Sequence, residues 1–339
     1  MAEKIGVLVT HALEERLRER IAELSNDLDL TWFPARRADE IGAEIWEKVE
    51  VLLTTRALPE PEQAPELRWV QLLTAGVERV REAAILEKDD LLVTTLSGGN
   101  APQAAEHAIA MMLALGQRLP DVFSQQTRGN WPTDKSERFA PTELRNATVG
   151  IVGYGSIGRE IARLLQNFNV EILATKADLK QLEEVGYTRP GLGDAMGEIP
   201  KRIYPAKALK SMFKECDFVV ACSPLTADSQ GMIGEDQLKA LRPDAYLIDI
   251  SAGGVVDQEA LLAALQGKKI AGAALDVFPE EPLAADSPLW ETPNVIISPH
   301  TAGLSPNFER RAVDLFCENL QRYLDKAPLL NLVDWERGY

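Results

Sequence analysis

The feature that most constrains the fold is a short apolar segment that leads into three closely spaced glycines and then into a helical pattern. Residues 148–152 read Thr-Val-Gly-Ile-Val, the glycines follow at Gly153, Gly155 and Gly158, and residues 159–166 read as a helix. Gly153 permits a tight turn, Gly155 lets another molecule approach the backbone, and Gly158 lets the helix pack on the strand. This order predicts part of a βαβ unit, and therefore a parallel sheet.

Strand-like runs alternate with helix-like segments on both sides of this turn. Before it the runs are 5–10, 28–32, 51–54, 69–73 and 91–95, and from it onward they are 148–152, 170–174, 218–221, 245–250, 270–275 and 294–298. Repeated strand-helix-strand units force parallel pairing. The predicted fold class is therefore α/β, with two doubly wound parallel-sheet domains of the Rossmann or flavodoxin-like type.

Breaks in the pattern divide the chain. Residues 97–100 are a Ser-Gly-Gly-Asn cluster, and the apolar segment 101–116 behind it predicts a buried helix. A second helical pattern covers 305–324 and predicts a tail that crosses back to the first domain. The pattern weakens over 121–143, within which residues 128–132 are expected to form an extended connector. Residues 177–207 are rich in glycine and proline and are interpreted as a surface excursion.

Composition excludes several classes of partner. The 339 residues suggest two domains, and the net charge of −16 repels nucleic acid and anionic lipid in the absence of a basic run. The first residues lack the pattern of a signal peptide, and the longest apolar run falls short of a membrane span. Three cysteines, Cys216, Cys222 and Cys317, match neither a disulfide framework nor a zinc site. A cytoplasmic protein with reduced thiols, no metal site and no membrane segment is expected.

The glycine turn predicts a dinucleotide site, because a helix N-terminus offers backbone N–H groups to a pyrophosphate. The residues expected to contact this cofactor are Gly153, Tyr154, Gly155, Ser156, Ile157 and Gly158. The next strand ends at Thr175-Lys176, where an NAD site normally has an acidic residue. A hydroxyl and a cation suit a 2′-phosphate, so NADP(H) is favoured over NAD(H). Asp178, two residues further on, keeps NAD(H) open as an alternative.

Two residues predict acid/base chemistry. His300 and Glu281 each follow a predicted parallel strand, at the sheet edge where ligands bind in open α/β folds. A carboxylate beside an imidazole fixes its orientation and favours its protonated form, as a general acid for carbonyl reduction requires. His11 and His107 lie in helical surroundings that favour packing or capping instead.

Five motifs together resemble the D-isomer-specific 2-hydroxyacid dehydrogenase family, in particular its glyoxylate and hydroxypyruvate reductases. They are the glycine turn, Asp276-Val277-Phe278 with Glu281-Pro282, Ser298-Pro299-His300-Thr301-Ala302-Gly303, Thr74-Ala75-Gly76-Val77 and Ser223-Pro224-Leu225-Thr226. The resemblance implies a substrate-binding domain of residues 1–100 plus 302–339 and a dinucleotide-binding domain of residues 101–301. It also implies an active-site cleft between them and a homodimer formed largely through the nucleotide domains.

The resemblance also implies roles for single residues. His300 would be the acid/base, Glu281 its partner, and Asp276 the residue that holds the nicotinamide carboxamide. The backbone of Ala75 and Gly76 would hold the substrate carboxylate. The further cofactor contacts implied are Ser223, Pro224, Ile250, Ser251, His300 and Gly303.

One expected residue is absent, because Ala252 stands where the resemblance places a substrate-clamping arginine. A guanidinium holds carboxylate and carbonyl oxygens in a fixed fork, which alanine cannot do. Removing a comparable donor lowers turnover on the order of 10²- to 10³-fold. Two explanations stay open: an introduced substitution, or a natural residue with activity lost or with Arg56 or Arg79 supplying the charge.

The sequence thus predicts an oxidoreductase that reduces a small 2-oxoacid such as glyoxylate, hydroxypyruvate or pyruvate with NADPH, strongly impaired by Ala252. One alternative is a nucleotide-sensing binding protein of the same fold, as in the family's corepressor relatives. A dehydrogenase for formate or phosphite is a further alternative, weakened because such relatives also keep the arginine.

Overall fold

The computed structural model describes residues 4–338 and divides into two compact units. Unit 1 contains residues up to 100, residues 185–189 and residues from 305 onward, and unit 2 contains 101–184 and 190–304. Residues 1–3, on which part of the signal-peptide prediction rests, lie outside the described residues. Among the described residues, no helix is both long and apolar enough to cross a membrane.

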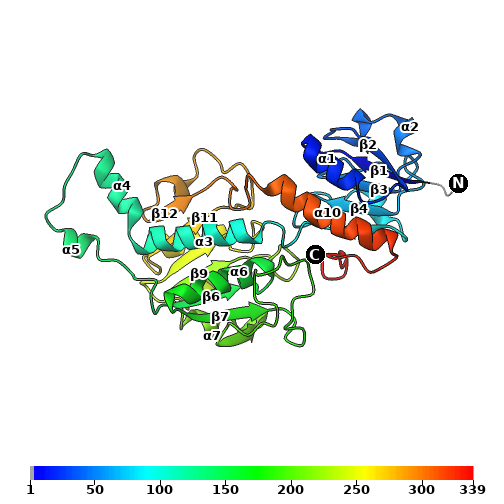
Figure 1. Ribbon diagram of the computed structural model, residues 1–339. Coiled ribbons are helices and arrows are strands. Elements are labelled where there is room, and N and C mark those ends of the chain that lie inside the picture. The colour runs from blue at the N-terminus through cyan, green and yellow to red at the C-terminus, as the bar shows by residue number, and fades with distance from the viewer. Residues whose placement is uncertain (1–3, 339) are drawn as a thin grey trace. The chain divides into compact units, whose positions relative to one another are not determined.

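Unit 2 is built on a seven-stranded parallel sheet in the order β12-β11-β10-β9-β6-β7-β8 (Figure 1). Its strands are β6 (Thr148–Val152), β7 (Glu171–Lys176), β8 (Arg202–Pro205), β9 (Phe218–Ala221), β10 (Tyr246–Asp249), β11 (Gly272–Leu275) and β12 (Val295–Ile297). Its helices are α3 (Ala101–Gly116), α4 (Leu119–Thr127), α5 (Lys135–Arg138), α6 (Ser156–Leu165), α7 (Leu209–Phe213), α8 (Glu235–Leu238) and α9 (Gln258–Gln266). The chain adds β7 and β8 on one side of β6 and then adds β9 to β12 on the other side, which is the Rossmann order with one added strand.

Both faces of this sheet are buried, as the alternation of side chains along each strand requires. Phe218 and Val220 of β9 face one apolar core, which α3 and α6 complete. Val219 and Ala221 face a second core, to which α7, α8 and α9 contribute. The strands therefore read as continuous apolar runs, and they form a rigid platform for the loops at their carboxyl ends.

Unit 1 contains a five-stranded parallel sheet in the order β2-β1-β3-β4-β5, which is the flavodoxin-like order. The strands are β1 (Ile5–Val9), β2 (Leu28–Trp32), β3 (Val51–Thr54), β4 (Trp69–Leu72) and β5 (Leu92–Thr94), and the helices are α1 (Glu15–Ala22), α2 (Ala43–Trp46) and α10 (Phe308–Leu324). Trp69 of β4 stacks on Phe316 and Tyr323 of α10, with ring centroids 5.4 and 5.5 Å apart. The carboxyl-terminal helix thus completes the core of the amino-terminal sheet. The prediction of two parallel-sheet α/β domains is confirmed.

Three elements were not predicted. Helices α4 and α5 flank the extended connector that was expected at residues 128–132, and these connector residues form neither helix nor strand. The segment 177–207 contains a strand, β8, that the sequence analysis missed. This strand pairs only with β7 and ends at Pro205, as an edge strand tolerates.

Candidate active site

The glycine turn joins the end of β6 to the start of α6, and its geometry accounts for all three glycines. Gly153 has φ +101°, and a Cβ there would lie 2.7 Å from Ser223 Oγ. A Cβ at Gly158 would collide with the carbonyl oxygen of Gly153. A Cβ at Gly155 would meet nothing within 4 Å. The turn therefore borders open space at the N-terminus of α6, which fits the pyrophosphate of a dinucleotide.

The strands on either side of β6 support this turn. Thr175 of β7 is 2% exposed, and its hydroxyl accepts a hydrogen bond from the Gly153 N–H at 3.2 Å. Lys176, the last residue of β7, is half-buried. After β9, the Ser223 hydroxyl donates to the carbonyl of Val152 at 3.0 Å. The hydroxyl of Thr175 thus holds the turn, and the predicted contacts of Thr175, Lys176 and Ser223 with a cofactor stay predictions.

A buried arginine, which the sequence analysis missed, ties residues 182–195 to the glycine turn. We call these residues the arm. Arg159, directly after Gly158, is 1% exposed, and its guanidinium donates to the carbonyls of Leu182 and Asp194. Its Nε lies 2.8 Å from Glu184 Oε2. Arg159 therefore holds both the outgoing and the returning half of the arm.

Tyr154 makes a second attachment of the arm. Its hydroxyl donates to Asp194 Oδ2 at 2.6 Å, and burial together with this hydrogen bond raises the pKa of Tyr154. Burial alone would raise the pKa of Asp194, but the hydrogen bonds from Tyr154 and from the backbone N–H groups of Ile199 and Glu198 lower it. The carboxylate of Asp194 is thus held ionised beside the glycine turn.

The tip of the arm belongs to unit 1. Tyr187 is 8% exposed in the unit 1 core, and its N–H donates to Asn331 Oδ1 at 2.8 Å. Asn331 Nδ2 donates in turn to the carbonyls of Thr95 and Ser97 at 3.1 and 2.8 Å. Tyr187 and Asp194 are buried, whereas half of the residues of the arm are exposed, so the arm is a surface excursion that is anchored at two buried residues. Only the position of Arg159 directly after the glycine motif could have indicated the attachment.

His300 and Glu281, which the sequence analysis predicted as a pair, are in contact. His300 Nδ1 lies 2.9 and 2.8 Å from the two carboxylate oxygens of Glu281. The side chain of His300 is 47% exposed, and that of Glu281 is 29% exposed. Glu281 follows β11 and His300 follows β12, which are neighbouring strands. Glu281 thus orients the ring through Nδ1, and Nε2 remains for proton exchange.

The backbone that carries His300 is fastened to Asp276. His300 has φ +54°, a left-handed conformation that is uncommon for residues other than glycine. Its N–H donates to the Asp276 carbonyl at 2.9 Å, and the N–H groups of Thr301 and Ala302 donate to the Asp276 carboxylate, each at 2.8 Å. The hydroxyl of Ser298 donates to the same carboxylate at 2.5 Å. The predicted contact of Asp276 with a nicotinamide carboxamide stays a prediction, and its observed role is to hold this turn.

The loop after β10 carries Ala252, whose side chain is exposed. Gly253 has φ +78°, and a Cβ there would lie 2.5 Å from the carbonyl oxygen of Phe278. The loop thus packs on the segment that leads to Glu281. At the end of β10, Asp249 is 3% exposed and accepts hydrogen bonds from the N–H and hydroxyl of Ser251 at 3.0 and 2.6 Å. Burial raises the pKa of Asp249 to about 6.

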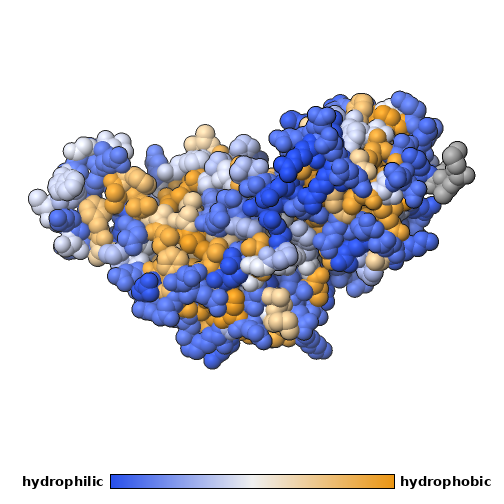
Figure 2. All heavy atoms as spheres, viewed as in Figure 1, coloured by the Kyte–Doolittle hydropathy of each residue, from blue (hydrophilic) through white to orange (hydrophobic). Residues whose placement is uncertain are grey.

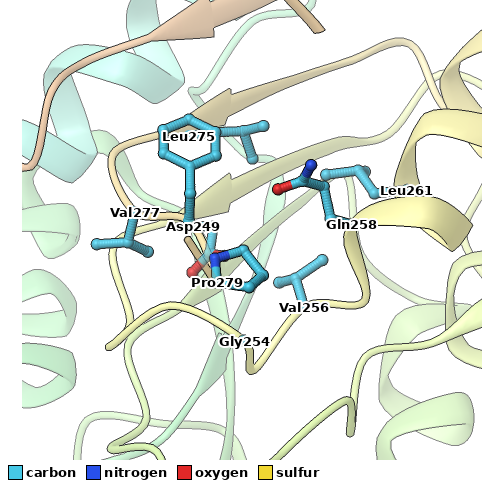
Figure 3. A pocket seen from close by; sticks show the side chains of 9 residues that line it. Asp249, Gly254, Val256, Gln258, Leu261, Leu275, Val277 and Pro279 are labelled. Carbon is cyan, nitrogen blue, oxygen red and sulfur yellow. The ribbon is translucent and has the colours of Figure 1, made fainter. Parts of the chain in front are cut away.

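A small hollow lies under this loop (Figure 3). Asp249 is the one charged residue among those lining it; the others are Gly254, Val256, Gln258, Leu261, Leu275, Val277, Phe278 and Pro279. Neither the His300–Glu281 pair nor the glycine turn borders the hollow. The hollow is therefore separate from the acid/base pair.

The predicted substrate contacts in unit 1 follow two neighbouring strands. Arg56 lies two residues after β3 and is exposed, and Ala75 and Gly76 follow β4. The hydroxyl of Thr74 donates to the carbonyl of Gly76 at 2.7 Å, which stabilises this turn. The three predicted contacts share the carboxyl edge of one sheet, and their roles stay predictions.

Fold and site together define a class. A Rossmann sheet with a glycine turn at the end of β6, and a histidine–carboxylate pair at the carboxyl edge of the same sheet, are the features of a nicotinamide-dependent dehydrogenase.

Comparison with known proteins gives the family. Residues 109–302 match the model of the D-isomer specific 2-hydroxyacid dehydrogenase NAD binding domain. The glyoxylate reductase of Korarchaeum cryptofilum is 31% identical over 340 residues, covering 98% of this chain and 97% of that protein. The glyoxylate reductase of Pyrococcus furiosus is 32% identical over 324 residues, covering 94% and 86%. The chain belongs to the D-isomer specific 2-hydroxyacid dehydrogenase family and is an oxidoreductase acting on CH–OH donors.

Solved structures agree with this assignment. A D-isomer specific 2-hydroxyacid dehydrogenase from Xanthobacter autotrophicus Py2, in complex with NADPH and MES, aligns with a TM-score of 0.77 at 27% identity, covering 98% of this chain and all of that one. An NADPH-dependent glyoxylate/hydroxypyruvate reductase from Sinorhizobium meliloti, in complex with citrate, aligns with a TM-score of 0.73 at 28% identity, covering 97% and 98%. Unit 2 therefore contains the NAD binding domain of this family.

Proposed function

We propose that the chain reduces a small 2-oxoacid, with glyoxylate, hydroxypyruvate or pyruvate as candidates, to the D-2-hydroxyacid with NADP(H). The contact between His300 Nδ1 and both oxygens of Glu281 carries this proposal. Relatives named glyoxylate reductase support the substrate class. Lys176 at the end of β7 and the NADPH bound in a similar structure support the choice of cofactor.

The chain's own contribution to the reaction is proton transfer and positioning. The nicotinamide, when bound, supplies the hydride that the carbonyl carbon accepts. His300 Nε2 donates a proton to the carbonyl oxygen during reduction and takes it back during oxidation. Glu281 holds Nδ1–H throughout, so the ring keeps one orientation in both directions. The glycine turn and Lys176 would bind the phosphates of the cofactor, and Ile250 and Ser251 would border its nicotinamide.

Ala252 makes the proposed activity weak. No guanidinium stands at this position to clamp the substrate, and loss of a comparable donor costs about 2.7–4 kcal/mol of transition-state stabilisation. Arg56 and Arg79 are the cations that would substitute for it. The predicted carboxylate contact with the backbone of Ala75 and Gly76 does not depend on Ala252.

The test is the initial rate of NADPH and NADH oxidation with the three candidate acids, for this chain and for Ala252→Arg. We expect Ala252→Arg to raise kcat/KM by about 100-fold or more with NADPH preferred, while Ala252→Met, of similar length without charge, does not. If neither the chain nor Ala252→Arg turns over any acid although both bind the cofactor, the reductase proposal fails. A nucleotide-sensing binding protein, the function that Ala252 favours, would then replace it.

We also propose that the protein is a cytoplasmic homodimer. Segment 119–139 of unit 2 exposes Phe123 and Trp131, which are 57% and 87% exposed. Figure 2 shows apolar side chains gathered on the visible face over α4. Exposed apolar surface of this kind is typical of protein interfaces. Reduced thiols at Cys216, Cys222 and Cys317 are consistent with the cytoplasm.

Sedimentation velocity tests the dimer. Phe123→Asp with Trp131→Asp should give a monomer where the unchanged chain gives twice that mass, because each charge would be desolvated in the interface. Leu304→Asp, at an exposed apolar residue outside the segment, is the control and should leave the mass unchanged. If the variant with both Phe123→Asp and Trp131→Asp is still a dimer, the interface lies outside segment 119–139.

A further inference from the structure

His107, whose pattern favoured simple packing, lies beside the turn that carries His300. It is on α3, which packs against β10 and β11, and its side chain is 14% exposed. Its Nε2 lies 3.2 Å from Ser298 Oγ and 3.7 Å from Asp276 Oδ1. Nε2 of His107, on α3, thus contacts the hydrogen-bond network of Ser298 and Asp276 in the candidate active site.

The network determines which groups donate. The Ser298 hydroxyl has one proton, and its 2.5 Å contact with the Asp276 carboxylate uses that proton. The oxygen of Ser298 can then only accept at its contact with His107, so Nε2 of His107 must carry a hydrogen. The direction of hydrogen bonding therefore runs from His107 to Ser298 to Asp276.

The Asp276 carboxylate connects this chain of hydrogen bonds to the acid/base residue His300. It accepts the N–H groups of Thr301 and Ala302, which directly follow His300. These bonds hold His300 at φ +54°, a conformation that persists only where the surroundings enforce it. A change in the carboxylate's position would move the backbone that carries His300.

We infer that His107 is a positioning residue for His300: its Nε2–H fixes the Ser298 hydroxyl on Asp276, and Asp276 holds the turn that places the acid/base imidazole. The inference rests on the proposed function of His300. Its structural part, the proton on Nε2, can be tested without any turnover.

Ring ¹⁵N–¹H NMR tests the structural part. The chain has three histidines, His11, His107 and His300, so single His→Gln variants assign every signal. We expect His107 to carry its proton on Nε2, and Ser298→Ala to shift this signal while that of His11 stays in place. An unprotonated Nε2 at His107 would overturn the inference, because that atom could then not donate to Ser298.

Steady-state kinetics tests whether His107 positions His300. The variants are made in the unchanged chain or in Ala252→Arg, whichever is more active. His107→Gln keeps an N–H near the position of Nε2, whereas His107→Met fills similar space without a donor. We expect kcat to fall about 10-fold in His107→Met and to stay within about 3-fold in His107→Gln. The KM for the cofactor should change less than about 2-fold in both. His11→Met, in unit 1, is the matched control with unchanged kcat.

A double-mutant cycle separates this role from general destabilisation. If His107 acts through Ser298, adding His107→Met to Ser298→Ala causes no further loss of kcat. Full additivity of the two losses, or a Gln variant as slow as the Met variant at a temperature where both are folded, would overturn the inference. If no version of the chain reduces a 2-oxoacid, the proposed function fails, and the NMR result alone judges the protonation of His107.

Discussion

Asp249 shows how one buried carboxyl group makes stability depend on pH. Burial raises its pKa to about 6, the charge of Asp276 adds to the rise, and the hydrogen bonds from Ser251 oppose it. An unfolded chain releases this proton near pH 3.9. The stability that neutral Asp249 contributes is therefore complete below about pH 4 and is lost as the pH rises through about 6.

Asp249→Asn should remove this dependence. Asparagine keeps an oxygen for Ser251 and carries no charge, so the free energy of unfolding at pH 7.5 should rise by up to about 3 kcal/mol. Urea unfolding at pH 4.5, 6.0 and 7.5 measures it. Asp257→Asn, at the exposed N-cap of α9, is the control and should change little, because asparagine also caps helices. Equal pH dependence in Asp249→Asn and the unchanged chain would contradict the prediction.

Lys176 is the residue on which the choice of cofactor depends. Lys176→Glu places a negative charge at the end of β7, where it repels a 2′-phosphate and suits a ribose hydroxyl. We expect the ratio of KM for NADPH to KM for NADH to rise by about 10-fold or more. Lys180→Glu, at a nearby exposed lysine, should shift the ratio less. An unchanged ratio in Lys176→Glu would assign recognition of the cofactor to other residues.

At the scale of elements, the sequence predicted strands and long helices well. β3, β6, β9 and α3 have the predicted bounds, because their apolar residues face one or two packed layers and the pattern records that burial. β8 was missed because Arg202 and Pro205 interrupt its pattern, and α4 because five of its nine residues are polar.

The residues of the candidate site likewise fall into those that the sequence predicted and those that it did not. The glycine turn and the two residues of the acid/base pair stand in short local patterns and were identified. The attachments of Arg159 to the arm and of His107 to Ser298 join residues 23 to 191 positions apart. Such contacts exist only in the folded chain, so no local pattern indicates them.

At the scale of elements, we predict that the arm depends on Arg159 for its attachment. Arg159→Met removes the guanidinium that pairs with the partly buried carboxylate of Glu184, which should destabilise the protein by about 3–5 kcal/mol. Adding Glu184→Gln should recover part of this loss. Arg189 in the arm should also become more sensitive to trypsin in Arg159→Met. Urea unfolding and timed proteolysis measure both effects, and Arg16→Met, at an exposed arginine of α1, is the control. A trypsin pattern that does not change would mean that the arm does not depend on Arg159.

At the scale of the whole molecule, unit 1 depends on α10 for its core. Phe316 is fully buried and stacks on Trp69. Phe316→Ala should destabilise unit 1 by about 3–5 kcal/mol through the cavity it leaves. Calorimetry should then show an earlier transition for unit 1 and an unchanged one for unit 2. A uniform shift of a single transition would show that the two units unfold together.

The arrangement of unit 1 also affects how the protein folds during synthesis. The first hundred residues leave the ribosome early, but Trp69 receives Phe316 and Tyr323 only when the last part of the chain has emerged. Asn331, which binds the carbonyls of Thr95 and Ser97, is made later still. The apolar core on this face of the unit 1 sheet is thus completed only after the strands of unit 2 have been made. In the interval the apolar face that α10 later covers is exposed to water, and such a surface is prone to aggregation.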